Sequence, residues 1–257
     1  MTAIVRTSWH NAEVLQNHPW TERLLSLRLN AEPMPFQAGQ FVTLRLLVTL
    51  DNGETELVAK SYSLINAPHE LTTEIFYNIV PNGKLSNALA RLRPGDQLEI
   101  SQPAKGFFVL DEIPDVPNLW LFATGTGLGP YLSILKTEAA WERFRHITLV
   151  HGVPLMEELA YADLIQSFAD QHPGQFRFIS CVTREPNPQG LAGRITTNFA
   201  FGTLEEAAGV TISPENTHVM LCGNHNMLNE MKELLGQRGL QRHLRHKPGH
   251  ITTEQYF

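Results

Sequence analysis

The chain has 257 residues, a hydrophobic fraction of 42% and a net charge of -6 at pH 7. This length accommodates two ordinary domains or one large one, and the apolar content excludes a disordered chain. The negative charge argues against a nucleic-acid partner, since phosphate-binding proteins normally display a basic excess.

Cysteine usage and hydropathy point to the compartment. Cys181 and Cys222 are far apart and form no CxxC pair, which predicts neither a disulfide framework nor an iron–sulfur cluster. Residues 1–20 lack the apolar core of a signal peptide, and no stretch approaches the roughly 18 apolar residues of a membrane span. We therefore expect a cytoplasmic protein without membrane contact.

The first half of the chain consists of short β-like runs separated by turn residues. The predicted strands are 24–29, 40–50, 57–64, 71–80 and 97–100. This spacing is typical of an antiparallel barrel or sandwich. A single helix is predicted at 84–92, where Leu85, Leu89 and Leu92 keep helical spacing.

Beyond the acidic, proline-containing stretch 111–118 the pattern changes to apolar strands alternating with helices. The predicted strands are 119–123, 147–151, 176–182 and 218–221, and the predicted helices are 128–138, 157–170 and 227–238. Such alternation predicts a doubly wound parallel sheet. We place the domain boundary so that the first domain is 1–113 and the second 114–257.

A glycine-rich turn opens the second half. Residues 123–130, with the sequence Ala-Thr-Gly-Thr-Gly-Leu-Gly-Pro, lie between an apolar strand and a helix. Such a turn lets the backbone approach a ligand, and the helix start offers N–H groups to a pyrophosphate. A tight structural turn is the alternative, but the order of strand, glycines and helix favours dinucleotide binding.

Two further segments of this half lie at predicted strand ends. Arg184 and Arg194 follow the third strand and are suited to holding a 2′-phosphate, which would select NADP over NAD, although each alone is an ordinary surface residue. Cys222, followed by Gly223 and Asn224, is suited to contact a nicotinamide ring. The alternative for Cys222 is a buried thiol that serves as a small hydrophobe.

In the first half, Lys60-Ser61-Tyr62-Ser63 ends a predicted strand. It offers a cation for phosphate, a flat ring for stacking and a hydroxyl for a polar ring edge, which suits a flavin. Alone it is compatible with any strand end. The segment 83–86, Gly-Lys-Leu-Ser, adds weight because its predicted helix start offers N–H groups to the same pyrophosphate.

Taken in chain order, the four motifs at 60–63, 83–86, 125–130 and 222–224 resemble the ferredoxin–NADP reductase family over nearly the whole chain. Segments 106–111, 221–224 and 248–257 resemble its bacterial branch, which serves ferredoxin or flavodoxin. The resemblance implies an antiparallel Greek-key β-barrel domain that binds FAD, followed by a doubly wound parallel-sheet domain that binds NADP(H), with the C-terminal tail returning to the flavin.

The resemblance also implies roles for individual residues. Those expected to contact FAD are Lys60, Ser61, Tyr62, Ser63, Tyr77, Lys84, Leu85, Ser86, Thr126, Tyr256 and Phe257. Those expected to hold the NADP phosphate are Thr183, Arg184 and Arg194. Those expected to act in catalysis are Ser63, Cys222, Glu254 and Phe257. No metal site is expected.

The implied reaction is hydride transfer between NADP(H) and FAD, followed by single-electron exchange with ferredoxin or flavodoxin, by a monomer. Phe257 would occupy the place of the nicotinamide until the nucleotide binds. The alternatives are a reductase component of an oxygenase, an NAD(P)H–flavin reductase, and a redox sensor that binds NADPH without turnover.

The chain departs from the family at three positions. Lys60 stands where the family usually has arginine, and lysine lacks the bidentate fork for a pyrophosphate. Pro154 stands where bacterial relatives commonly have arginine, which removes one cation for the nucleotide. Phe257 presents a smaller aromatic face than the tryptophan that often ends close relatives. The basic segment 238–247 has two interpretations: it docks an acidic electron carrier, or it is an ordinary solvent-exposed helix end.

Overall fold

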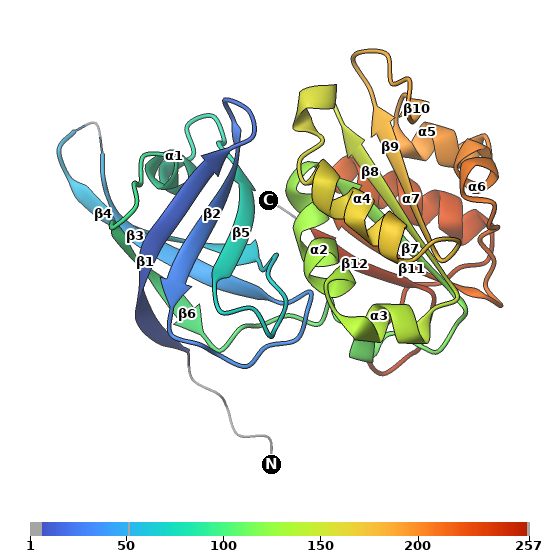
Figure 1. Cartoon of the computed structure of the whole chain (residues 1–257), viewed down its shortest axis with the longest axis horizontal. Helices are drawn as coiled ribbons and strands as arrows, with labels where there is room; N and C mark the ends of the chain where they lie inside the picture. Colours follow the sequence, from blue (N-terminus) through green and yellow to red (C-terminus); the bar gives the residue numbers. More distant parts are fainter. Residues whose placement is uncertain (1–6, 51, 256–257) are drawn as a thin grey trace. The chain divides into compact units, whose positions relative to one another are not determined.

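The computed structural model describes residues 7–50 and 52–255. The chain divides into two units, shown along the colour gradient of Figure 1. The first comprises the chain up to residue 109 together with 132–136, and the second comprises 110–131 and the chain from 137 onward. None of the described helices combines the length and the apolar character that a membrane-spanning segment needs.

An antiparallel sheet of six strands forms the first unit, with the order β4-β3-β6-β1-β2-β5. The strands are β1 (Ser8–Pro19), β2 (Leu24–Ala31), β3 (Phe41–Thr49), β4 (Thr55–Ser63), β5 (Thr73–Asn78) and β6 (Gln97–Gln102). Just after β4, Leu64 bridges to Ile75 of β5. This bridge brings the two edges of the sheet together, so the sheet curls into the predicted Greek-key barrel.

The barrel core explains which strands the sequence predicts. Leu27, Leu44, Ile75 and Ile100 are wholly buried and come from strands with clear apolar runs. By contrast, β1 was not predicted because only Ala12 and Val14 of its twelve residues are buried. Its pairing with β2 and β6, rather than its own pattern, makes it a strand.

Helix α1 (Lys84–Leu89) packs Leu85 and Leu89 into the barrel core. It ends earlier than the predicted residue 92. The side-chain amide of Asn17 donates hydrogen bonds to the carbonyls of Leu89 at 2.8 Å and Leu92 at 3.3 Å. Asn17 thus satisfies carbonyls that the end of the helix leaves without intrahelical partners.

A parallel sheet of six strands forms the centre of the second unit, with the order β10-β9-β8-β7-β11-β12. The strands are β7 (Asn118–Thr124), β8 (His146–Val153), β9 (Phe176–Val182), β10 (Leu191–Ala192), β11 (Thr217–Gly223) and β12 (Ile251–Gln255). The four predicted strands are the central ones. The edge strands β10 and β12 were not predicted. β10 has only two residues, and β12 has the mostly polar sequence Ile-Thr-Thr-Glu-Gln, so neither contains an apolar run.

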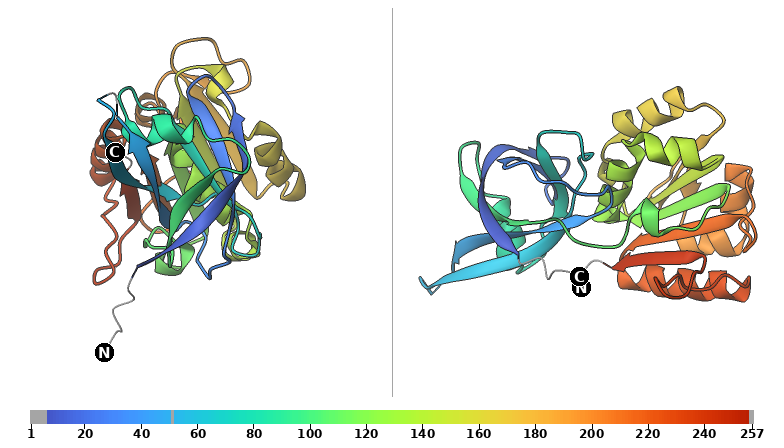
Figure 2. Two further views of the ribbon diagram at one scale, coloured as in Figure 1. Left: turned by 90° about the vertical axis from the view of Figure 1, so that its left-hand side faces the viewer. Right: turned by 90° about the horizontal axis from the view of Figure 1, so that it is seen from below.

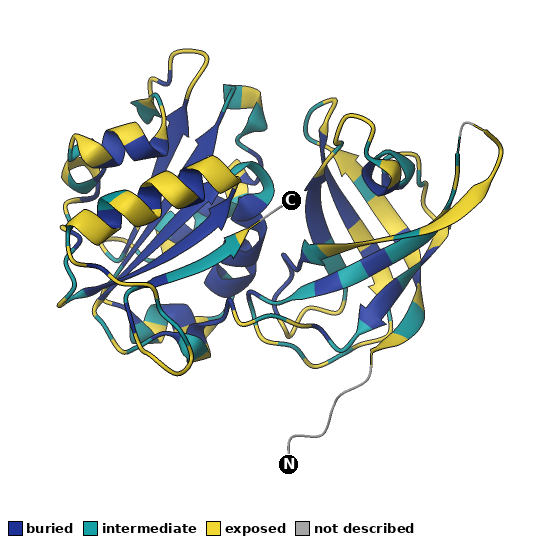
Figure 3. Ribbon diagram, turned by 180° about the vertical axis from the view of Figure 1, so that it is seen from behind, coloured by how far each residue is buried: buried dark blue, intermediate teal, exposed yellow. Residues whose placement is uncertain are grey.

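Helices cover both faces of this sheet, as the right-hand view in Figure 2 shows. Trp141 of α3 packs against Phe168 of α4 on one face, while α5, α6 and α7 bury apolar side chains against β7, β8 and β11 on the other. Figure 3 shows the central strands buried and the outer side of α7 exposed. The predicted doubly wound fold is confirmed.

The helical segments from residue 110 onward have between three and thirteen residues. They are η1 (Leu110–Glu112), η2 (Gly125–Leu128), α2 (Gly129–Leu135), α3 (Glu138–Arg143), η3 (Met156–Glu158), α4 (Ala162–Gln171), α5 (Ile195–Ala200), α6 (Thr203–Ala208) and α7 (His225–Gln237).

A buried histidine links β11 to the edge strand β12. His218 is 1% exposed, and its Nε2 lies 2.8 Å from the hydroxyl of Thr252. The ring of His243 packs edge-on against it, with centroids 5.6 Å apart. Burial, and then the positive charge of His243, His250 and Arg143, lowers the pKa of His218 to about 3. The folded unit therefore keeps this imidazole neutral.

We predict that the stability of the second unit falls as the pH drops below the unfolded histidine pKa of about 6.5. Between that value and about 3 the unfolded state binds a proton that folded His218 does not, so stability is lost on acidification and is full above pH 6.5. At pH 5 the loss is about 2 kcal/mol from His218. Urea unfolding at pH 7 and pH 5 measures it, and His218→Gln removes this share. An unchanged pH dependence in that variant contradicts the prediction.

Candidate functional site

The carboxyl ends of the parallel strands gather the predicted nucleotide residues. In register, Ala123 of β7 pairs with Cys222 of β11, and Cys222 pairs with Glu254 of β12. Thr126 lies two residues after the end of β7, and Thr183 directly follows β9, at the same carboxyl end of the sheet. Loops at this edge form the ligand crevice of doubly wound sheets.

Two strand-to-helix turns, after β7 and after β11, pack tightly against each other at the carboxyl end of the sheet. The hydroxyl of Thr124 accepts hydrogen bonds from the backbone N–H of Asn224 at 2.9 Å and from its side-chain amide at 3.1 Å. Asn224 Oδ1 accepts from the N–H of Met227 at 2.9 Å and so caps α7. The turn after β7 and the start of α7 are therefore held as one structure.

Glycine is required on both sides of this contact. Gly223 has φ of +144°, and a Cβ there would lie 2.0 Å from the hydroxyl oxygen of Thr124. A Cβ on Gly127 would lie 2.5 Å from the carbonyl oxygen of Cys222. These approaches explain the glycines of both motifs by packing.

Gly125 is different, because a Cβ there would meet no atom within 4 Å and its φ is +52°. The turn is thus open beside Gly125 and leads into a helix start, which fits a dinucleotide phosphate. Its carbonyl lies 3.0 Å from Nε2 of His151, a fully buried residue of β8. Sequence reasoning missed His151, whose only signal is a polar residue within the run Leu149-Val150-His151.

Arg184 and Arg194 flank the end of β9. The backbone N–H of Arg184 donates to the carbonyl of Pro154 at 3.0 Å, and the N–H of Gly193 donates to the carbonyl of Val182 at 2.8 Å. Both guanidinium groups are exposed, and neither forms an ion pair with another described residue. They are available for a phosphate.

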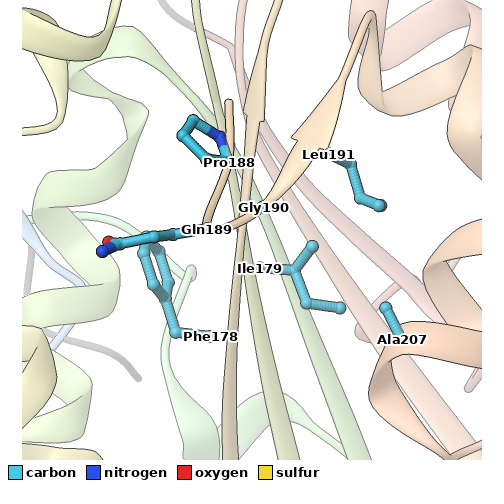
Figure 4. A pocket seen from close by; sticks show the side chains of 7 residues that line it. All are labelled: Phe178, Ile179, Pro188, Gln189, Gly190, Leu191 and Ala207. Carbon is cyan, nitrogen blue, oxygen red and sulfur yellow. The ribbon is translucent and has the colours of Figure 1, made fainter. Parts of the chain in front are cut away.

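A pocket of about 310 Å³ lies beside β10 (Figure 4). It is lined by Phe178, Ile179, Leu191, Ala207 and the segment 188–190. None of these is a predicted site residue. The exposed guanidinium groups, rather than this pocket, mark the region suited to an anion.

Cys222 is completely buried, and Glu254 is half-buried. Burial of the thiol fits a small apolar wall at the end of β11.

In the barrel, Tyr62 lies half-buried against the core. Its ring meets that of Tyr77 edge-on, with centroids 6.3 Å apart. The hydroxyl of Tyr77 donates to Asn17 Oδ1 at 3.0 Å, and burial raises the pKa of Tyr77 to about 12. Burial likewise raises the pKa of Tyr62. Both hydroxyl groups are therefore protonated at neutral pH, and the Tyr62 ring packs against a Tyr77 ring that Asn17 anchors.

The other predicted flavin residues of β4 differ in how far they are exposed to solvent. Lys60 and Ser61 are exposed, while Ser63 is buried. The Ser61 hydroxyl lies 3.3 Å from that of Thr43 on β3. Alternation along the strand places Lys60 and Tyr62 on one face of β4. A cation and a half-buried ring on one face fit a flavin nucleotide.

The first three residues of α1 make different contacts: one forms an ion pair, one packs in the core and one binds the preceding turn. Lys84 forms an ion pair with Glu56 at 2.5 Å, with both groups about half exposed. The buried Ser86 hydroxyl accepts a hydrogen bond from the N–H of Val80 at 3.1 Å, and Leu85 lies in the core. Leu85 and Ser86 therefore contribute packing and turn geometry. Of the other predicted residues, Tyr256 and Phe257 lie outside the described residues.

Two family models match this chain. Residues 17–108 match the oxidoreductase FAD-binding domain, and residues 121–233 match the oxidoreductase NAD-binding domain. The flavodoxin/ferredoxin–NADP reductases of Buchnera aphidicola subsp. Schizaphis graminum and Escherichia coli K12 are 43% and 40% identical to it, each over 97% of this chain and 99% of the relative. The chain belongs to the flavodoxin/ferredoxin–NADP reductase family.

A solved structure agrees with this assignment. The ferredoxin–NADP+ reductase of Neisseria gonorrhoeae, crystallised with FAD and NADP, superposes with a TM-score of 0.89 at 30% identity, over 97% of this chain and 99% of the other. The predicted family, two-domain fold and pair of cofactors are thereby confirmed. The roles of individual site residues stay predictions.

We predict that Gly223→Ala destabilises the second unit by about 3 kcal/mol, because it adds both backbone strain and overlap with Thr124. Gly174→Ala is the matched control, since Gly174 also has positive φ but a Cβ there would meet no atom within 4 Å. The control should lose only about 1 kcal/mol. Denaturant unfolding of both variants measures the difference, and equal losses would contradict the packing argument.

Proposed function

We propose that this oxidoreductase transfers hydride between NADP(H) and FAD and exchanges single electrons between the flavin and ferredoxin or flavodoxin. In this proposal residues 1–113 hold FAD and residues 114–257 hold NADP(H). The observation that carries it is the pair Arg184 and Arg194. Both side chains are exposed, form no ion pair with another described residue, and lie at the same carboxyl end of the sheet as the glycine turn.

On the flavin side, the exposed Lys60 and Lys84 would hold the pyrophosphate, with Lys84 exchanging Glu56 for it. The face of β4 that carries Tyr62 offers a flat, neutral ring for stacking. The Ser63 hydroxyl would bind the polar edge of the flavin. Bound FAD supplies the conversion between two-electron and one-electron chemistry.

On the nucleotide side, the open turn would receive the pyrophosphate at the backbone N–H of Thr126, a residue that the family resemblance assigns to FAD contact. The exposed Thr183, Arg184 and Arg194 would bind the 2′-phosphate, where a fork-shaped cation suits phosphate geometry. Cys222 and Glu254, paired in register, would border the nicotinamide. Tyr256 and Phe257 lie outside the described residues, and the family resemblance implies that they would contact FAD.

The partner proposal rests on the names of the relatives, which act with flavodoxin or ferredoxin. Within the basic segment 238–247, Arg238 is paired with Glu205 and Arg245 with Glu112, while Arg242 and Lys247 are exposed. Those two cations would meet an acidic carrier. We further propose a cytoplasmic monomer, and two buried free cysteines support a reducing compartment.

Carrier reduction tests the proposal directly. Purified protein loaded with FAD should reduce ferredoxin or flavodoxin with NADPH under anaerobic conditions, as followed by the absorption of the carrier. NADPH binding without any transfer would instead indicate a redox sensor. Turnover that requires added free flavin would indicate a flavin reductase.

We predict that Lys60→Ala weakens FAD binding by about tenfold, because it removes one charged contact to phosphate. Lys60→Arg should tighten binding severalfold, since its planar fork can contact two oxygens. Equilibrium dialysis of FAD measures both. Lys232→Ala, an exposed lysine of α7, controls for net charge. An unchanged FAD affinity in Lys60→Ala would remove Lys60 from the site.

We predict that Pro154→Arg raises the preference for NADPH over NADH by about tenfold in kcat/KM, because it restores a cation beside Arg184. The carbonyl of residue 154, which accepts from the Arg184 N–H, is kept by any substitution. Arg184→Ala should shift the preference in the opposite direction. Steady-state kinetics with both nucleotides measures the ratio, and an unchanged ratio in Pro154→Arg contradicts the prediction.

A further inference from the structure

The imidazole of His151 forms a hydrogen bond with the glycine turn that follows β7. His151 lies in β8, next to β7 in the sheet, and its side chain is completely buried. Its Nε2 lies 3.0 Å from the carbonyl oxygen of Gly125. A carbonyl can only accept, so Nε2 carries the hydrogen and Nδ1 is bare. Among the described residues Nδ1 has no hydrogen-bond partner, whereas Nε2 has the Gly125 carbonyl.

The imidazole is a constant donor at ordinary pH. Burial lowers the pKa of His151 to about 4, against a smaller opposite effect of the Gly125 carbonyl. The ring is therefore neutral at neutral pH. Its donated hydrogen bond stays the same throughout the range in which the protein would work.

The direction of this carbonyl determines the direction of the next amide. In a planar trans peptide, the C=O and the following N–H point in opposite directions. Because the Gly125 carbonyl points to His151, the N–H of Thr126 points away from β8. The Cβ position of Gly125 has no atom within 4 Å, so the turn is open there. Glycine would also tolerate the reversed peptide, which would present a carbonyl oxygen to an anion.

We propose that His151 is a positioning residue for NADP(H): by holding the Gly125 carbonyl, it directs the Thr126 N–H toward the pyrophosphate. This inference rests on the proposed function. It predicts a contribution to pyrophosphate binding that is separate from the 2′-phosphate contacts at Arg184 and Arg194. A histidine that only fills the core would affect both parts of the nucleotide alike.

Two variants separate these roles. His151→Phe keeps a flat ring of similar size and removes the donor, while His151→Gln offers an amide N–H of similar reach. The Kd values of NADP+ and of adenosine 2′-monophosphate, which lacks the pyrophosphate, are measured by calorimetry on the FAD-loaded protein. We expect His151→Phe to weaken NADP+ about tenfold, with adenosine 2′-monophosphate unchanged and His151→Gln close to wild type.

The opposite results are equally clear. Unchanged NADP+ affinity in folded His151→Phe overturns the inference, as does equal weakening of both ligands. If His151→Phe does not fold, the 15N chemical shifts of His151 in the wild type decide, since a hydrogen on Nδ1 overturns the inference and one on Nε2 supports it. Wild-type protein that binds neither ligand would instead refute the proposed function, whatever the tautomer.

Discussion

The contact on which the nucleotide half depends is the close packing of two strand-to-helix turns. Thr124 binds Asn224, while Gly223 and Gly127 allow backbones to approach at distances that no side chain permits. This packing positions the open turn at Gly125 and the start of α7 together. The predicted nucleotide residues lie at the same edge because parallel strands end there in register.

The cations of the two proposed anion sites differ in their ion pairing. Arg184 and Arg194 are exposed and form no ion pair among the described residues, so a phosphate would meet them directly. Lys84 is already paired with Glu56, but both groups are about half exposed. Such a pair contributes roughly 0–1 kcal/mol, so exchanging its carboxylate for a pyrophosphate costs little. The rings of Tyr62 and Tyr77 are held by burial and by Asn17, independently of this exchange.

The sequence predicted the features that repeat locally. Apolar runs identified the four central parallel strands, and glycines between strand and helix identified the turn. It did not predict β1, β10 or β12, whose few buried residues leave pairing with neighbours to define them. Nor did it reveal Asn17 or His151, since their bonds reach a helix end and a turn that are distant in sequence. Contacts of this kind follow from tertiary structure and leave no periodic pattern.

As a member of this family with an FAD-binding and an NAD-binding domain, the protein passes hydride from NADPH to FAD. The most direct measurement is the visible absorption spectrum of the FAD-loaded protein during anaerobic titration with NADPH. We expect the oxidised flavin absorption to bleach with about one equivalent of NADPH, since one hydride carries both electrons. Flavin absorption that persists with excess NADPH and excess NADH would contradict it.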